Sequence, residues 1–341
     1  MKYLPFGKTG VSVSELGFGA IPIIRLSFEE AERVLRRAFD LGITFFDTAN
    51  LYHDSEEKIG CALSPVRDKL FIATKSMKRD GKSVAEHIDL SLSRMKTDYV
   101  DLFQFHQVAQ EKDREAIYAP GGAMEAALAA QKAGKVRFIG VSSHSIPMAM
   151  KLIETGDFVS IQFPFNFIET EAASELFPLA RRLGVAIIGM KPFAGGAITK
   201  ASLAFKFLRS QPDLFPIPGY DSVESVEEIV SFYEKPNIVS EDDLAEMTAV
   251  KNELGGQFCR RCEYCQPCPF GVAIAGSMIY PLLAVRMSPK VASAFASPNL
   301  DTVPNCTECG VCVSRCPYTL PIPEMLKKHY ELYLEHKSAA E

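Results

Sequence analysis

The chain has 341 residues, which suits a barrel of about 250 residues followed by a smaller module. Hydrophobic residues make up 47% and charged residues 23% of the chain, a balance typical of globular proteins, and the formal net charge of -5 gives no electrostatic reason to expect a nucleic-acid partner. No apolar run approaches the ~20 residues that cross a bilayer, and Met1–Lys8 lacks the apolar core of a signal peptide. We therefore expect a cytoplasmic protein with no membrane partner.

The first part of the chain alternates strand and helix patterns. It opens with an expected β-hairpin at Lys8-Thr9-Gly10, and Ser27 followed by Glu29 and Glu30 marks the start of the first helix. Eight apolar runs predict strands, at residues 16–20, 43–49, 70–74, 100–105, 136–141, 159–163, 185–190 and 215–217. Eight helical patterns follow them in turn, at residues 28–41, 55–63, 84–96, 122–133, 146–154, 171–183, 199–210 and 223–234. The polar segment 107–121 is expected to be an exposed loop or a mobile lid.

The predicted strands are near-continuous apolar runs, as in a parallel sheet that is covered on both faces. Eight strand–helix units predict an α/β fold, the (β/α)8 TIM barrel. The alternative is an open doubly wound sheet. Such a sheet usually carries a G-x-G-x-x-G turn after its first strand, and the chain has none there.

A second, smaller domain is expected after the barrel. The alternation ends around Lys235-Pro236-Asn237, and Ser240 then caps a helix that Gly255-Gly256 terminates. Beyond Cys259 the chain shows helical patches at 277–287 and 322–336 and no convincing strand. The sequence therefore predicts a barrel domain over 1–235 and a mainly α-helical domain over 236–341.

Four residues suited to carbonyl reduction stand at successive strand ends. Asp47 lies near the end of the second predicted strand and Tyr52 follows it, while Lys75 follows the third and His106 the fourth. Reduction by hydride needs a proton for the forming alkoxide. A Tyr hydroxyl, with a free pKa near ~10, donates slowly at neutral pH, but a neighbouring Lys ammonium favours the phenolate, and an Asp holds that Lys in place and charged. A His on the opposite side can orient the substrate oxygen.

The chain resembles the aldo-keto reductase family over roughly residues 1–234. The matching segments occur in the family's order and are Gly7-Lys8-Thr9-Gly10, Leu16-Gly17-Phe18-Gly19, Asp47-Thr48-Ala49 with Tyr52, Glu56 with Gly60, Gly140-Val141-Ser142, Gln162 and Ile217-Pro218-Gly219. The resemblance implies that NADP(H) or NAD(H) binds across the barrel mouth without a Rossmann fold. It also implies that Tyr52 is the general acid, that Lys75 activates it, that Asp47 anchors the Lys, and that His106 orients the carbonyl.

The resemblance further implies cofactor contacts at strand ends. Ser142, Ser143 and Gln162 would meet the nicotinamide carboxamide, and Met190 stands where many members stack an aromatic ring on the nicotinamide. The region after Ile217-Pro218 holds Gly219 and Asp221, with no Lys or Arg before Ser231, so the choice between NADP(H) and NAD(H) stays open.

Two nearby charged residues are each open to two interpretations. Asp221 is interpreted either as an acceptor for a ribose hydroxyl or as the cap of the next helix. Arg25, after the first strand, either meets an anionic substrate or is solvated.

Eight of the nine cysteines form two groups near the C-terminus. They read Cys259-x2-Cys262-x2-Cys265-x2-Cys268-Pro269 and Cys306-x2-Cys309-x2-Cys312-x3-Cys316-Pro317. Thiolates at this spacing followed by Pro indicate iron–sulfur clusters, whereas zinc sites pair two C-x2-C units. Cys61 stands apart and is interpreted as a small buried apolar residue.

The two cysteine groups resemble those of two-cluster ferredoxins. That resemblance implies two [4Fe–4S] clusters with crossed ligands. One cluster would use Cys259, Cys262, Cys265 and Cys316, and the other would use Cys306, Cys309, Cys312 and Cys268. The last gap of the first group is x2 where the ferredoxin pattern has x3, which leaves the pairing of Cys268 open.

The combined features predict an NAD(P)H-dependent oxidoreductase that reduces an aldehyde or ketone to an alcohol, or the reverse. The clusters would transfer electrons, with a possible redox protein partner, or would tie the C-terminal helices together. A flavin is possible, although no motif supports it. The alternative functions are a ferredoxin-linked electron-transfer protein and a nicotinamide-binding redox sensor with little carbonyl turnover.

Overall fold

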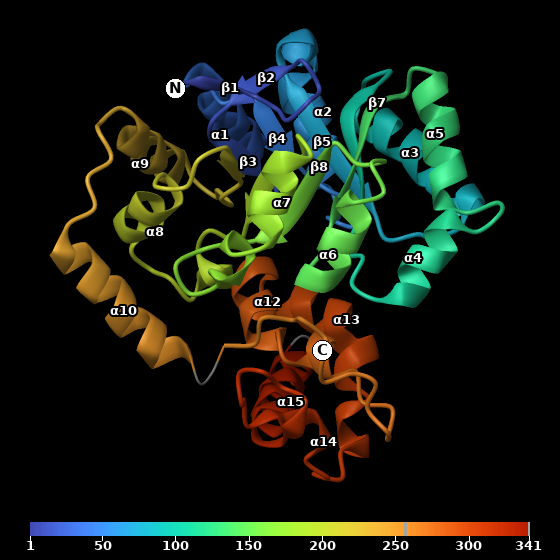
Figure 1. Cartoon of the computed structure of the whole chain (residues 1–341), viewed down its shortest axis with the longest axis vertical. Coiled ribbons are helices and arrows are strands. Elements are labelled where there is room, and N and C mark those ends of the chain that lie inside the picture. The colour runs from blue at the N-terminus through green and yellow to red at the C-terminus, as the bar shows by residue number, and fades with distance from the viewer. Residues whose placement is uncertain (256–257, 340–341) are drawn as a thin grey trace. The chain divides into compact units, whose positions relative to one another are not determined.

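A computed structural model describes residues 1–255 and 258–339 of the chain. The chain divides into two compact units (Figure 1). The first unit comprises Met1–Phe193 and Lys200–Val239, and the second comprises Ala194–Thr199 and Ser240–Glu341. The sequence did not predict that the short segment 194–199 clusters with the C-terminal unit.

The first unit contains an antiparallel hairpin and an eight-stranded sheet. The hairpin pairs β1 (Tyr3–Pro5) with β2 (Ser12–Ser14), as predicted around Lys8-Thr9-Gly10. The sheet consists of parallel strands in sequence order, namely β3 (Gly17–Gly19), β4 (Phe45–Asp47), β5 (Phe71–Ser76), β6 (Val100–Phe105), β7 (Val136–Ser142), β8 (Ser160–Pro164), β9 (Ala186–Met190) and β10 (Leu214–Pro216). Each apolar run predicted as a strand therefore forms one.

A parallel bridge between Gly19 and Gly219 brings the first and last strands of the sheet together. The Gly19 N–H donates to Pro218 O at 2.7 Å. A Cβ at position 19 would lie 2.7 Å from Ile217 O, so only glycine allows this approach. The predicted (β/α)8 barrel is confirmed.

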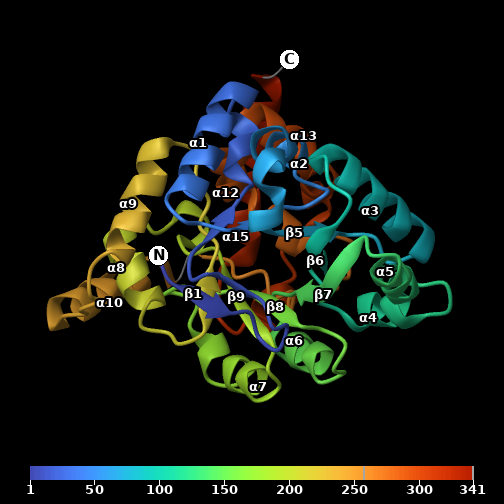
Figure 2. The ribbon, with the colours of Figure 1, turned by 90° about the horizontal axis from the view of Figure 1, so that it is seen from above.

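Helices surround the sheet (Figure 2). Those of the first unit are α1 (Phe28–Asp40), α2 (Ser55–Leu63), α3 (Gly81–Met95), α4 (Glu111–Tyr118), α5 (Ala123–Lys132), α6 (Ile146–Ile153), α7 (Leu176–Arg182), α8 (Ala201–Leu208) and α9 (Val223–Tyr233), with short 3-10 helices η1 (Pro22–Arg25), η2 (Ser64–Lys69) and η3 (Glu171–Ala173). Helix α1 begins at the predicted cap, where the Ser27 hydroxyl accepts from Glu30 N–H and the Glu30 side chain accepts from Ser27 N–H.

The segment 107–121 is not simply a loop, because it contains helix α4. Glu111 and Asp113 occupy the first turn of α4, and Ile117 is fully buried. Glu111 Oε2 accepts from Lys151 Nζ at 2.6 Å, and Tyr118 Oη donates to Asp157 Oδ2 at 2.7 Å. The buried Ile and these contacts hold the segment against the barrel, whereas its polar composition alone indicated an exposed loop.

An aromatic cluster fills the N-terminal end of the barrel. Phe6, from the hairpin turn, lies with its ring centroid 5.7 Å from Phe45, 4.8 Å from Phe71 and 5.2 Å from Phe215. Phe45 and Phe71 are the first residues of β4 and β5. Since this end is packed with side chains, the opposite end, where the strands finish, is left for function.

The second unit is helical throughout the part that the structure describes. Its helices are η4 (Ala194–Gly196), α10 (Glu241–Gly255), α11 (Ile274–Ser277), α12 (Tyr280–Met287), α13 (Pro289–Leu300), η5 (Val303–Asn305), α14 (Val311–Ser314) and α15 (Ile322–Ser338). Tyr280 and Tyr333 are fully buried and meet edge to face, which packs α12 against α15. The expected end of α10 at Gly256 lies outside the described residues. Among the described helices, none combines the length and apolar composition needed to cross a bilayer.

Candidate active site and metal centre

A buried ion pair lies at the C-terminal ends of β4 and β5. Lys75 Nζ donates to Asp47 Oδ1 at 2.6 Å and to Thr48 O at 2.6 Å. Both side chains are almost completely buried. Burial raises the pKa of the Asp47 carboxyl, and the Lys75 ammonium opposes that rise. Two buried charges are tolerated in such a place when they are paired and hydrogen-bonded, as these are.

The structure brings Tyr52 and His106 next to this ion pair. Tyr52 lies in the turn between β4 and α2, and its ring centroid is 5.3 Å from Lys75 Nζ. The His106 ring follows β6 and meets the Tyr52 ring edge to face, with centroids 5.9 Å apart. Four residues from three strand ends, predicted from the sequence to act together, therefore share one site.

The sequence analysis missed Gln104, which is fully buried on β6. Gln104 Nε2 donates to Asp47 Oδ2 at 3.2 Å and to Gln162 Oε1 at 2.9 Å. Gln162 Nε2 approaches Asp47 Oδ1 at 3.5 Å. The polar Gln104 within the apolar run Leu102-Phe103-Gln104-Phe105 was the available signal, since a buried amide in a barrel strand requires a hydrogen-bond partner.

The predicted cofactor residues of β7 also hold a loop. Ser142 Oγ accepts from Gln107 N–H at 2.8 Å, and Ser143 Oγ donates to Val108 O at 2.6 Å. Both serines are buried. They fix the segment that follows His106.

Met190 ends β9 with its sulfur 3.8 Å from Gln162 Nε2. The two residues come from neighbouring strands, since Pro164 of β8 pairs with Met190. The predicted nicotinamide residues Gln162 and Met190 therefore lie side by side at the same end of the barrel as Lys75.

The region after β10 differs from one of the expectations. Asp221 does not cap α9, because Ser222 is the N-cap and its hydroxyl accepts from Ser225 N–H. Asp221 instead pairs with Arg25, whose Nη2 lies 2.5 Å from Asp221 Oδ2. Arg25 is thus held by an ion pair. Its guanidinium, which comes from η1, brings a positive charge next to the segment 219–230, which itself contains no Lys or Arg.

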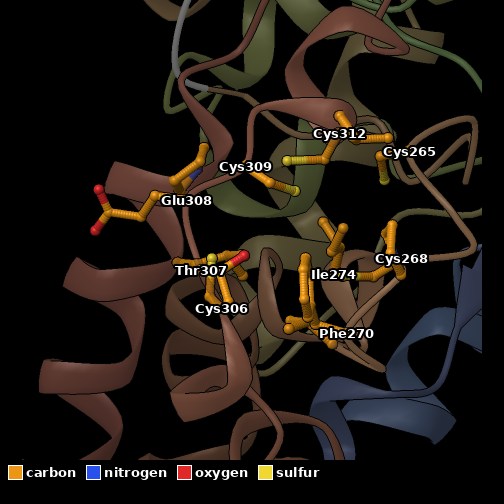
Figure 3. Close-up of a pocket in the computed structure, with 14 residues that line it drawn as sticks. Cys265, Cys268, Phe270, Ile274, Cys306, Thr307, Glu308, Cys309 and Cys312 are labelled. Atoms are coloured by element: carbon orange, nitrogen blue, oxygen red, sulfur yellow. The ribbon is translucent and has the colours of Figure 1, made fainter.

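The eight clustered cysteines line two cavities in the second unit. The cysteines that line one cavity are Cys259, Cys262, Cys265 and Cys316. The other is lined by Cys265, Cys268, Cys306, Cys309 and Cys312, so Cys265 borders both cavities. Figure 3 shows these side chains around the second cavity, together with Phe270 and Ile274.

The thiols are spread around each cavity and do not converge on the position of a single metal ion. Among the described residues, no three His, Cys, Asp or Glu side chains converge closely enough to hold a single metal ion. A cluster with several irons takes one thiolate on each iron, so its ligands are spread around a volume. Burial raises the pKa of Cys265 to about 12, and loading a metal there would therefore release its proton.

Cys61 is exposed, and the expectation that it is buried was wrong. Lys96 Nζ lies 3.3 Å from its sulfur. The residue sits on α2 with its side chain towards solvent, which its neighbours Ala62 and Leu63, both buried, did not reveal.

Known proteins match the chain in two places. Residues 15–204 match the model of the aldo/keto reductase family. The chain belongs to this family. Residues 258–321 match the model of a 4Fe-4S dicluster domain, which confirms the predicted character of the cysteine-rich part of this aldo/keto reductase.

Several relatives are oxidoreductases. The chain is 34% identical over 218 residues to the aldo-keto reductase str7 of Strobilurus tenacellus, covering 58% of this chain and 63% of that protein. It is 29% identical over 228 residues to the uncharacterized oxidoreductase YrpG of Bacillus subtilis, covering 58% and 68% respectively. A further relative, at 31% over 226 residues, is the L-glyceraldehyde 3-phosphate reductase of Escherichia coli, covering 58% and 63%.

Solved structures share the barrel fold. The aldo-keto reductase AKR11C1 of Bacillus halodurans in its holo form superposes with a TM-score of 0.63 at 23% identity, covering 74% of this chain and 96% of that one. An aldo-keto reductase of Klebsiella pneumoniae in complex with NADPH gives 0.64 at 19% identity, covering 74% and 95%. These likenesses support the fold of this aldo/keto reductase.

Proposed function

We propose that this aldo/keto reductase reduces an aldehyde or ketone to an alcohol, or runs the reverse reaction, with a nicotinamide cofactor. The observation that carries the proposal is the buried Lys75 ammonium, held by Asp47 and Thr48 at 2.6 Å and lying 5.3 Å from the Tyr52 ring. The buried positive charge of Lys75 thus lies beside the Tyr52 ring. The family membership supports the same reaction class.

The roles of the four residues follow from that arrangement. Tyr52 gives its phenolic proton to the carbonyl oxygen, and Lys75 stabilises the phenolate that remains. Asp47 keeps Lys75 charged and oriented, with Gln104 holding the second carboxylate oxygen. His106, across the Tyr52 ring, orients the carbonyl oxygen by a hydrogen bond. When bound, NAD(P)H supplies the hydride that goes to the carbonyl carbon, so the product is the alcohol.

The residues present fit a nicotinamide carboxamide. Gln104 Oε1 is a buried acceptor without a hydrogen-bond partner in the described part of the chain, and it belongs to the side chain that contacts Gln162. Ser142, Ser143, Gln162 and Met190 surround the same end of the barrel. NADPH is the first cofactor to test, because the Klebsiella relative binds it. NADH is the second, because the region of Gly219 and Asp221 has no Lys or Arg for the 2′-phosphate of NADPH.

A comparison of Tyr52→Phe with the wild type tests the proposed acid. We expect the variant to lose carbonyl reduction by about 10²- to 10⁴-fold, the range for a general acid, while NADPH and NADH titrations followed by nucleotide fluorescence stay unchanged. Phenylalanine keeps the ring that meets His106 and removes only the proton donor. A variant with the full rate would overturn the assignment of Tyr52.

For the second unit, we propose two [4Fe–4S] clusters held by crossed cysteine sets. The linings of the two cavities support this proposal. Each cavity gathers three cysteines of one group, and the other group contributes Cys316 to the first cavity and Cys268 together with Cys265 to the second. When bound, the clusters would supply single-electron transfer to a redox protein partner, and they would tie the two cysteine loops together.

Cys316→Ser and Cys268→Ser separate the two sets. The crossed arrangement predicts that Cys316→Ser perturbs the cluster that needs Cys259, Cys262 and Cys265, and that Cys268→Ser perturbs the other. Anaerobic purification with iron and sulfide analysis, followed by electron paramagnetic resonance of the reduced protein, measures each cluster. If both substitutions damage the same cluster, the pairing is wrong.

A further inference from the structure

We propose that Arg94 and Arg79 are positioning residues that hold the Tyr52 and His106 loops in register for proton transfer. The inference rests on the proposed function, because it concerns how these two side chains are placed. Arg94 belongs to the last turn of α3, and Arg79 belongs to the loop that enters it. Each arginine donates to a backbone carbonyl of one loop.

Arg94 holds the loop that carries Tyr52. Its Nη1 donates to Asn50 O at 3.3 Å and to Glu56 Oε2 at 3.3 Å. Asn50 lies two residues before Tyr52, and Glu56 follows it in the first turn of α2. Arg94 therefore binds a residue on each side of Tyr52, Asn50 before it and Glu56 after it.

Glu56 connects these contacts to the strand of Lys75. The Glu56 side chain is about 1% exposed, and its Oε1 accepts from Thr74 Oγ1 at 2.6 Å. Thr74 directly precedes Lys75. In addition, Asn50 N–H donates to Lys75 O at 3.0 Å. The loop of the acid and the strand of its activating lysine are thus joined through one carboxylate and one backbone hydrogen bond.

The helices are close enough for this connection only because residue 60 is glycine. A Cβ at Gly60 would lie 2.4 Å from Arg94 O and 2.7 Å from Met95 Cα. Any other residue would push α2 away from the end of α3. The same contact that excludes a side chain at Gly60 brings Glu56 within reach of the Arg94 guanidinium.

Arg79 holds the loop that carries His106. Its Nη2 donates to His106 O at 2.7 Å and to Gln107 O at 3.3 Å, and its Nε contacts Asp113 Oδ1 at 3.4 Å. Gln107 has a positive φ of 55°, a conformation that needs support from its surroundings. Nη2 meets both carbonyls while Nε meets the carboxylate on another side, and an ammonium in the place of Nη2 leaves that carboxylate contact unformed.

Kinetics of Arg94→Gln and Arg79→Gln test the proposal. With NADPH and benzaldehyde as the probes, we expect kcat to fall by about 10- to 100-fold, the effect of misplacing reacting groups by about 1 Å, while the KM values and the NADPH fluorescence titration stay unchanged. Arg94→Lys should keep most of the rate, because one ammonium can reach both Asn50 O and Glu56. Arg79→Lys should stay impaired.

Arg36→Gln is the matched control, since Arg36 pairs with Glu32 on the exposed side of α1 and contacts neither loop. If the glutamine variants of Arg94 and Arg79 keep the wild-type kcat and lose only thermal stability, the arginines are structural and the proposal fails. Should Arg94→Gln not fold, Glu56→Gln carries the same test. Wild-type protein that turns over no better than Tyr52→Phe would instead reject the proposed function.

Discussion

The barrel mouth and the cysteine loops differ in how their polar groups are satisfied. At the mouth, Lys75, Asp47, Gln104 and Gln162 form contacts of 2.6–3.5 Å with one another, inside a sheet whose other end is packed with aromatic rings. In the loops, the cysteine sulfurs instead line two cavities. The barrel site is formed by the chain alone, whereas the cysteine loops are shaped for a group that the chain must acquire.

The backbone of the cysteine loops shows the same difference. Arg261, Glu263 and Glu308 adopt positive φ values between two cysteines of a group, as does Gly310. Left-handed residues wrap the chain tightly around a cavity, but for side chains other than glycine they are unfavourable. We infer that the metal group offsets that cost, since metal binding and folding are coupled in small metal domains.

Removal of iron should have the largest effect, which is the unfolding of the cysteine loops. Chelation under anaerobic conditions should expose residues 258–273 and 306–321 to proteolysis, because structural metals contribute about 10 kcal/mol or more to the folding of small domains. The barrel should keep its thermal transition and its NADPH binding. Mass spectrometry of the fragments locates the cuts. Loops that remain resistant in the iron-free protein would show that the helices of the second unit hold them without metal.

A substitution in the barrel core should destabilise the barrel and leave the iron–sulfur unit unchanged. Phe6→Ala removes a fully buried ring that contacts Phe45, Phe71 and Phe215, so we expect the barrel to lose about 3–5 kcal/mol. Urea unfolding followed by circular dichroism measures it, and the iron content should not change. Leu128→Ala, at an exposed position on α5, is the control and should stay within about 0.5 kcal/mol. Equal losses in both variants would contradict the role of the aromatic cluster.

The smallest expected effect is the pH-dependent stabilisation that the Glu30 cap gives to helix α1. The Ser27 backbone N–H and hydroxyl hold the pKa of Glu30 below its ordinary value of 4.5. A carboxyl with a lowered pKa stabilises the fold above 4.5, and that stabilisation is lost as the pH falls through the folded-state pKa. Glu30→Gln should therefore lower Tm at neutral pH and match the wild type at strongly acidic pH. Glu29→Gln, without the cap contact, serves as the control.

Local sequence patterns determined the architecture. Continuous apolar runs and helical periodicity specified the strands and helices of the barrel, because each pattern depends only on residues within one element. The family's segments occur in order along the chain, so the aldo/keto reductase assignment was available from the sequence. The spacing within each cysteine group likewise identified iron–sulfur chemistry, since three neighbouring thiolates in a short loop must serve one cluster.

The tertiary structure alone decided which distant residues meet. The contacts of Gln104 with Asp47, of Arg94 with Asn50 and of Arg25 with Asp221 join residues 44 to 196 positions apart. The burial of Ile117, which explains why segment 107–121 contains helix α4, is visible only in the structure. The same holds for segment 194–199, which clusters with the C-terminal unit. Polar composition shows that a residue can form a hydrogen bond, but packing determines its partner. The sequence therefore specified the chemistry of this protein, and the barrel specified how that chemistry is arranged.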